Sequence, residues 1–88
     1  MLDRDKKHTI IKKFAVHTGD TGSPEVQSAI LTEEIKEVSR HLKQHKKDIA
    51  SRRGLLQMVN RRRKLLNYLK KEDEKRHISL LRRLKLKK

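Results

Sequence analysis

The fold is decided by residues 23–45, which read SPEVQSAILTEEIKEVSRHLKQH. Ser23 is a favoured N-cap residue, Pro24 suits the first helical position, and Glu25 suits the positive end of a helix dipole. Apolar residues then recur at steps of three and four, at Val26, Ile30, Leu31, Ile35, Val38 and Leu42. This spacing predicts a helix with an apolar face about five turns long, and that face needs a partner.

A second long helix supplies the partner. Residues 45–48 interrupt the apolar pattern with charge, and Asp48 or Ser51 can cap the helix that follows. Apolar residues resume at Leu55, Leu56, Val59, Leu65, Leu66 and Leu69, with a break at residues 61–64, Arg-Arg-Arg-Lys. The sequence therefore predicts a tight turn and an antiparallel hairpin, whose second helix runs through residue 71 and is the longest.

Two shorter helices flank the hairpin. The first runs from Asp3 to Val16, and a loop of small polar residues follows it at 17–22. The last begins at the N-cap Asp73 and continues to residue 88. Their apolar residues are Ile10, Ile11, Phe14 and Ala15 in the first and Ile78, Leu81 and Leu84 in the last. We expect an all-α fold in which four helices share one core, as a single domain over residues 1–88.

Composition limits the function classes. Eighty-eight residues with 33% apolar side chains can bury one small core, which excludes a two-domain enzyme. The chain has no cysteine, so disulfides and thiolate metal sites are excluded. It has no apolar run near the roughly 20 residues of a membrane span, and its amino end is charged, unlike a signal peptide. We therefore expect a cytoplasmic protein with no membrane partner.

The charge distribution points to a polyanionic partner. Lys and Arg number 25 against 11 Asp and Glu, a net charge of +14. The excess lies in residues 41–88, which contain 18 Lys and Arg against four Asp and Glu. Phe14 and Tyr68 are the only aromatic residues, too few for the stacked-base surfaces of sheet-based RNA binders. A helical protein that binds nucleic acid is favoured.

A catalytic alternative rests on His41, His45 and Asp48, which helical spacing places within two turns of one another. Two imidazoles and a carboxylate can hold a metal ion, as in a small metal-dependent hydrolase. However, the neighbouring lysines disfavour a bound cation, and the glutamate of the zinc protease motif is missing. The sequence also lacks a phosphate-binding glycine loop and a nucleophile elbow. We expect no catalysis, no cofactor and no small-molecule substrate.

The basic residues around the turn suit phosphate groups. Any one of them could simply lie on a solvated face, but together they form a cluster: Lys43, Lys46, Lys47, Arg52, Arg53 and residues 61–64. His41, Asp48 and Ser51 lie within this cluster and can donate or accept hydrogen bonds at base edges and 2′-hydroxyls. Asp48 has the alternative role of a helix cap. Gly54 inside the second long helix indicates a close approach, either by a ligand or by a neighbouring helix.

A second small polar group lies near the start of the first long helix. Gly22 permits close backbone approach and Thr21 offers a hydroxyl to a sugar or base, although both also suit an ordinary turn. Gln27 lies one turn into the helix. Tyr68 can stack and hydrogen-bond at once, with burial in the core as the alternative.

Four motifs in register carry a family resemblance: DTGSPEVQ at residues 20–27, HKKD at 45–48 after His41, SRRGLL at 51–56, and RRKLLNYL at 62–69. From about Phe14 to the carboxyl end the chain resembles bacterial ribosomal small-subunit protein fifteen. The resemblance implies a four-helix, non-catalytic protein that binds the central domain of small-subunit rRNA early in assembly. It also implies contact with large-subunit rRNA across the subunit interface and with neighbouring small-subunit proteins.

The resemblance also assigns roles to residues. It implies that Thr21, Gly22, Gln27 and Tyr68 clamp a three-way RNA junction. It implies that His41, Asp48 and Ser51 read a shallow minor groove with a G·U/G·C element. Further RNA contacts are expected from the basic cluster at His45, Arg52, Arg53 and Lys64.

The chain departs from the family pattern at four positions. Ile49 and Ala50 stand where the family commonly has two histidines, His77 replaces a usual tyrosine, and Lys85 replaces a glycine. The first dozen residues match poorly. From composition alone, a helical DNA-binding architectural or regulatory protein, with a basic helix in the major groove, is the rival interpretation.

Overall fold

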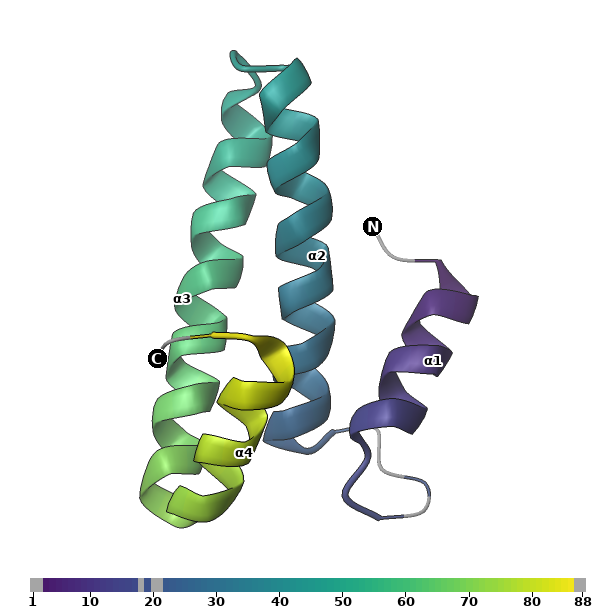
Figure 1. Ribbon diagram of the computed structural model, residues 1–88. Helices are drawn as coiled ribbons and strands as arrows, with labels where there is room; N and C mark the ends of the chain where they lie inside the picture. Colours follow the sequence, from purple (N-terminus) through teal and green to yellow (C-terminus); the bar gives the residue numbers. More distant parts are fainter. Residues whose placement is uncertain (1–2, 18, 20–21, 87–88) are drawn as a thin grey trace.

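The computed structural model describes residues 3–17, 19 and 22–86. Its helices are α1 (Arg4–Phe14), α2 (Pro24–Gln44), α3 (Ile49–Glu72) and α4 (Glu74–Leu84), and the described residues contain no strand. The helices α2 and α3 form a long antiparallel hairpin, α4 folds back against its base, and α1 stands beside α2 (Figure 1). The expected all-α fold with a long hairpin and two shorter helices is confirmed.

Side chains of the expected types begin the helices. The Ser23 hydroxyl accepts a hydrogen bond from the Val26 amide at 3.2 Å, and Asp73 accepts one from the Arg76 amide at 3.1 Å. At the hairpin turn the cap is Asp48 rather than Ser51. The boundaries differ at two ends, because α1 stops at Phe14 and α4 stops at Leu84, before Lys87 and Lys88, which lie outside the described residues.

The four helices share a core, as expected, and a second apolar cluster lies toward the turn. The cluster at the base unites all four helices through Phe14, Val26, Ala29, Leu66, Leu69 and Leu80. The cluster toward the turn joins only α2 and α3, through Leu31, Val38 and Met58. Between them along α3, Arg62 turns inward and donates a hydrogen bond to the Thr32 hydroxyl at 3.2 Å. This polar bridge interrupts the apolar seam of the hairpin.

Leu56 and Met58 on α3 lie differently from what the apolar spacing predicts, and the structure decides between the alternatives for Tyr68 and Gly54. Leu56 was expected on the buried face but is 61% exposed, and Met58 is buried instead. Tyr68 is 56% exposed, which excludes its alternative place in the core. A Cβ built on Gly54 has no atom within 4 Å, so crowding by a neighbouring helix does not explain this glycine.

A buried ion pair fastens α4 to the start of α2. The Glu25 carboxylate, on a residue only 5% exposed, accepts two hydrogen bonds of 2.6 Å from Nε and Nη2 of Arg76. Arg83 adds a second attachment on α4, since its guanidinium lies 4.2 Å from the Phe14 ring centroid of α1. These contacts hold the two short helices against the base of the hairpin.

Replacing the buried carboxylate is expected to weaken the fold. Glu25→Gln replaces one acceptor oxygen with an NH2 group that cannot accept from Arg76 and removes the negative charge, which should lower the free energy of unfolding by about 1–3 kcal/mol in urea denaturation. Glu37→Gln is the matched control, because Glu37 pairs with the exposed Lys6 ammonium, and such pairs contribute about 0–1 kcal/mol. Equal losses in the two variants would contradict the role of Glu25.

The end of α4 carries a strained residue. Lys85 has φ 58° and ψ 40°, the left-handed conformation, and its amide donates to the Arg82 carbonyl at 3.1 Å. Glycine takes this conformation without the steric cost of a Cβ, which accounts for the glycine expected there from the family pattern.

Lys85→Gly is therefore expected to stabilise the protein by about 0.5–1 kcal/mol, measured from the urea or thermal unfolding midpoint. Lys85→Ala separates conformation from charge, because it removes the ammonium but keeps the Cβ. A gain in Lys85→Ala equal to that in Lys85→Gly would show that the backbone conformation is not the cause.

Candidate nucleic-acid interface

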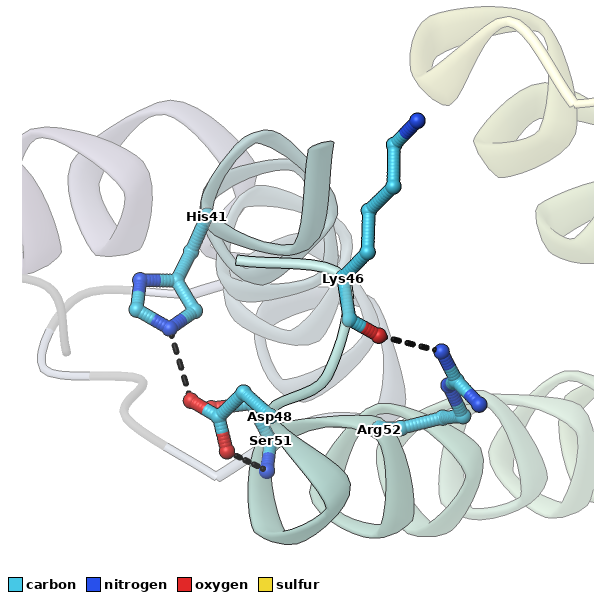
Figure 2. Close-up of polar contacts among 5 residues, drawn as sticks. All are labelled: His41, Lys46, Asp48, Ser51 and Arg52. Carbon is cyan, nitrogen blue, oxygen red and sulfur yellow. Dashed lines mark hydrogen bonds and ion pairs between the residues drawn. The ribbon is translucent and has the colours of Figure 1, made fainter. Parts of the chain in front are cut away.

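The turn end of the hairpin brings together His41, Asp48 and Ser51. The Asp48 carboxylate accepts hydrogen bonds from the Ser51 amide at 3.0 Å and from the Ser51 hydroxyl at 2.7 Å. Nε2 of His41, one turn before the end of α2, lies 2.8 Å from Asp48 Oδ2 (Figure 2). One carboxylate therefore caps α3 and ties it to α2.

The hydrogen bonds keep Asp48 ionised. The bonds from the Ser51 amide and hydroxyl, followed by that from His41, hold the pKa of the Asp48 carboxyl well below its usual range. The three side chains remain partly open to solvent, with 44% exposure for His41 and 31% for Asp48. The cap and the RNA contact are therefore compatible roles for Asp48. We refer to these three residues as the turn triad.

His45 stacks against the turn triad. Its ring centroid lies 4.5 Å from that of His41, with 26° between the ring planes. Stacked rings do not direct their nitrogens at a common point. Among the residues the structure describes, no group of three His, Cys, Asp or Glu is placed to hold a metal ion. The metal-dependent alternative gains no support from this geometry.

Among the expected basic residues, Lys43, Lys46, Lys47, Arg52 and Arg53 are exposed around the turn, whereas residues 61–64 lie further along α3. Arg52 has a structural task as well, because its Nη2 donates to the Lys46 carbonyl at 2.6 Å and so braces the turn (Figure 2). The Lys46 side chain extends away from the turn triad in the same view. Arg53 and Lys64 are exposed on α3 and are available for phosphates.

The second polar group lies at the base of the hairpin. The Gln27 amide donates from Nε2 to the Gly22 carbonyl at 2.6 Å, which ties the loop before α2 to its second turn. Gly22 has open space where a Cβ would lie. Tyr68 is exposed near the end of α3, one turn from Lys64. Thr21 lies outside the described residues.

The two polar groups are separate but share a side of α2. Gln27 and His41 are 14 residues apart in one helix, which corresponds to about 21 Å along the axis and about 40° around it. On α3, Ser51 and Tyr68 differ by about 100° around the axis. Both groups are open to solvent. A rigid hairpin therefore presents two polar groups at a fixed spacing.

The inward position of Arg62 and the burial of His77 were not predicted from the sequence. Arg62 was expected on the surface, but it faces inward. It lies four residues after Met58 and four before Leu66, and this helical spacing could have indicated its position. Burial lowers the pKa of this guanidinium. His77 is also buried, which its charged surroundings in the sequence did not indicate.

The chain is similar to known proteins over its whole length. The family model described as ribosomal protein S15 matches residues 6–87. The small ribosomal subunit protein uS15 of Caldanaerobacter subterraneus subsp. tengcongensis is 57% identical over 88 residues, all of both chains. Proteins of the same name from Natranaerobius thermophilus and Clostridium botulinum (strain Hall) are 53% and 55% identical over 87 residues, with at least 98% of each chain covered. No helix in the described part is long and apolar enough to cross a membrane.

The depressed pKa of Asp48 predicts a pH dependence of stability. The unfolded carboxyl titrates near pH 3.9, so the stabilisation is complete above that pH and is lost as the pH falls below it. Asp48→Asn keeps a good N-cap but cannot titrate. Unfolding midpoints measured from pH 5 to pH 2 should therefore fall less steeply in Asp48→Asn than in the wild type. Glu72→Gln is the exposed control and should keep the wild-type slope; parallel curves for all three proteins would contradict the assignment.

Proposed function

This chain belongs to the ribosomal protein S15 family, and on that premise we propose that it holds two elements of small-subunit rRNA at a fixed separation. It is a structural constituent of the small ribosomal subunit and binds rRNA, without catalysis. The finer proposal rests on one observation: the turn triad is locked by hydrogen bonds, and Gln27 lies on the same side of α2 about 21 Å away.

The turn triad reads a shallow minor groove in this proposal. A-form RNA exposes base edges and 2′-hydroxyls in a wide minor groove, where short polar side chains reach them. The ionised Asp48 carboxylate accepts hydrogen bonds, and Ser51 and His41 can both donate and accept. Because their mutual bonds already fix their positions, little side-chain freedom is lost on binding. A G·U/G·C element is the target that the family resemblance implies.

The group at the base clamps a three-way junction of the central domain. Gly22 lets a backbone approach, Gln27 holds the loop in place, and the exposed Tyr68 ring can stack on a base. Thr21 is the further member expected from the sequence. Lys64, one turn from Tyr68, supplies charge to a phosphate beside the junction. Fixing both elements would let the protein nucleate assembly of the central domain, as a single domain over residues 1–88 beside other small-subunit proteins.

The tip of the hairpin contacts large-subunit rRNA across the subunit interface. His45, Arg52 and Arg53 are exposed at this tip, together with Lys46 and Lys47. Ile49, which stands where the family commonly has a histidine, is 68% exposed. An isoleucine offers no hydrogen bond, so the contact in this chain relies on the flanking cations.

The DNA-binding rival is disfavoured by the turn triad itself. In a DNA major groove a carboxylate finds donors only on the bases, such as the cytosine N4 amine, and no 2′-hydroxyl. In a minor groove of RNA, the same carboxylate accepts hydrogen bonds from 2′-hydroxyls and exocyclic amines. The anion in the basic cluster thus favours RNA.

Substitutions should separate recognition from charge. Ser51→Ala and Asp48→Ala are expected to weaken binding to a three-way-junction RNA about 2- to 10-fold, with little change in the slope of log affinity against log salt. Lys64→Ala should reduce the magnitude of that slope by about 0.7–0.9, because one phosphate contact is lost. Affinities measured by filter binding or fluorescence anisotropy at four salt concentrations give both quantities.

Lys36→Ala is the charge-matched control for Lys64→Ala. Lys36 lies about 180° around α2 from Gln27 and pairs with Glu33 at 3.4 Å, so its removal should leave the slope unchanged. Equal slopes for all four variants would refute the division of roles. A duplex DNA of equal length serves as competitor, and a preference for DNA at moderate salt would overturn the proposed function as a whole.

A further inference from the structure

A groove between α3 and α4 lies outside both polar groups. It has a volume of about 600 Å³, and its apolar lining includes Val59, Leu66 and Leu81. Its polar lining consists of Arg62, Arg63, Asn67, Lys70 and His77. Three of these residues are cationic and none is acidic, so the groove carries uncompensated positive charge.

Arg62 makes no ion pair with any residue that the structure describes. Its guanidinium is partly desolvated, and burial lowers its pKa, which means that the charged form is destabilised by its surroundings. The bond from its Nη1 goes to the Thr32 hydroxyl, a neutral group. Arg63 and Lys70 stand seven positions apart on α3 and make no ion pair or hydrogen bond with another described side chain. A bound anion would compensate all three cations.

His77 is the second sign of a ligand. It is 9% exposed and lines the groove, yet its ring makes no hydrogen bond with any described residue. Its ring nitrogens are not among the fully enclosed side-chain atoms that lack a partner, so an N–H of this ring can reach a ligand in the groove. The ring is thus a polar group, about nine-tenths buried, beside three cations. Its position on α4 faces the cations of α3 across the groove.

We propose that this groove binds a phosphate group of the RNA backbone, with Arg63 and Lys70 pairing with its charge and His77 donating a hydrogen bond. The inference rests on the proposed function and adds a third point of contact. On α3, Arg63 and Lys70 are about 140° and 160° around the axis from Tyr68, so this phosphate lies on a different side of the hairpin from the junction clamp. The contact holds α4, as well as the hairpin, against RNA.

Dimethyl phosphate is the probe for the site, since it reproduces a phosphodiester without bases or sugar. Dimethyl phosphate is titrated at constant ionic strength into protein whose histidine rings carry an NMR label. The His77 resonance should shift and reach saturation. The His77→Phe variant identifies that resonance by its absence. Arg63→Ala combined with Lys70→Ala should weaken binding at least tenfold. Arg82→Ala removes an exposed arginine of α4 outside the groove and should bind as the wild type. The absence of a shift, or an equal shift in all variants, would overturn the site. A shift with oligoglutamate but not with dimethyl phosphate would also overturn it and would indicate an acidic protein partner.

The RNA experiment tests the ligand's source. Lys70→Ala and Arg63→Ala should each reduce the magnitude of the salt slope for three-way-junction RNA by about 0.7–0.9, and Arg82→Ala should not. His77→Phe should lower affinity about 2- to 10-fold, whereas His77→Tyr, which restores a donor, should recover most of it. Unchanged slopes in a protein that still prefers this RNA over DNA would overturn the groove contact alone. Loss of the preference itself would instead contradict the proposed function.

Discussion

The hairpin depends on one carboxylate at its turn. Asp48 accepts a hydrogen bond from the Ser51 amide in the first turn of α3 and, through His41, joins that helix to the last turn of α2. The apolar cluster nearest the turn consists of buried Leu31, Val38 and Met58 with four partly buried side chains packed against them, and the polar bonds add to this packing. The polar bonds join the two long helices at the turn. The spacing of the groups along each helix follows from its rise per residue.

The same bonds fix the positions of the groups that we propose to face RNA. A turn triad whose members already bond with one another keeps its shape without a partner, and the loop at the base is fixed in a similar way by Gln27. At the base, the Glu25–Arg76 pair and the contact of Arg83 with Phe14 hold α4 and α1 against the hairpin. Stability and recognition therefore draw on the same polar contacts, which is consistent with a scaffold protein that works by rigidity.

The sequence predicted much of this arrangement, because its strongest signals are local. The side chains of Ser23, Asp48 and Asp73 each accept a hydrogen bond from the amide three residues later. These helix starts could therefore be predicted from neighbouring residues alone. The apolar periodicity predicted the hairpin but not which side of α3 Leu56 and Met58 take, since both fit a stripe of three and four. The partners of Glu25 and Arg62 are 51 and 30 residues away, and no local pattern indicates them. The location of the turn triad was predictable, whereas its bond network and the groove beside His77 required the packed helices.

The Arg62–Thr32 bridge places a polar contact inside the hairpin, where its two apolar clusters meet. Leu31 and Leu65 of the cluster toward the turn lie on the base side of this bridge, and that cluster involves only α2 and α3. Separation of the helices that starts at the tip meets a charged, hydrogen-bonded level before it reaches the four-helix base. Opening of the hairpin from its turn would therefore expose a partly buried cation before it exposes the four-helix base, which sets the order in which the fold comes apart.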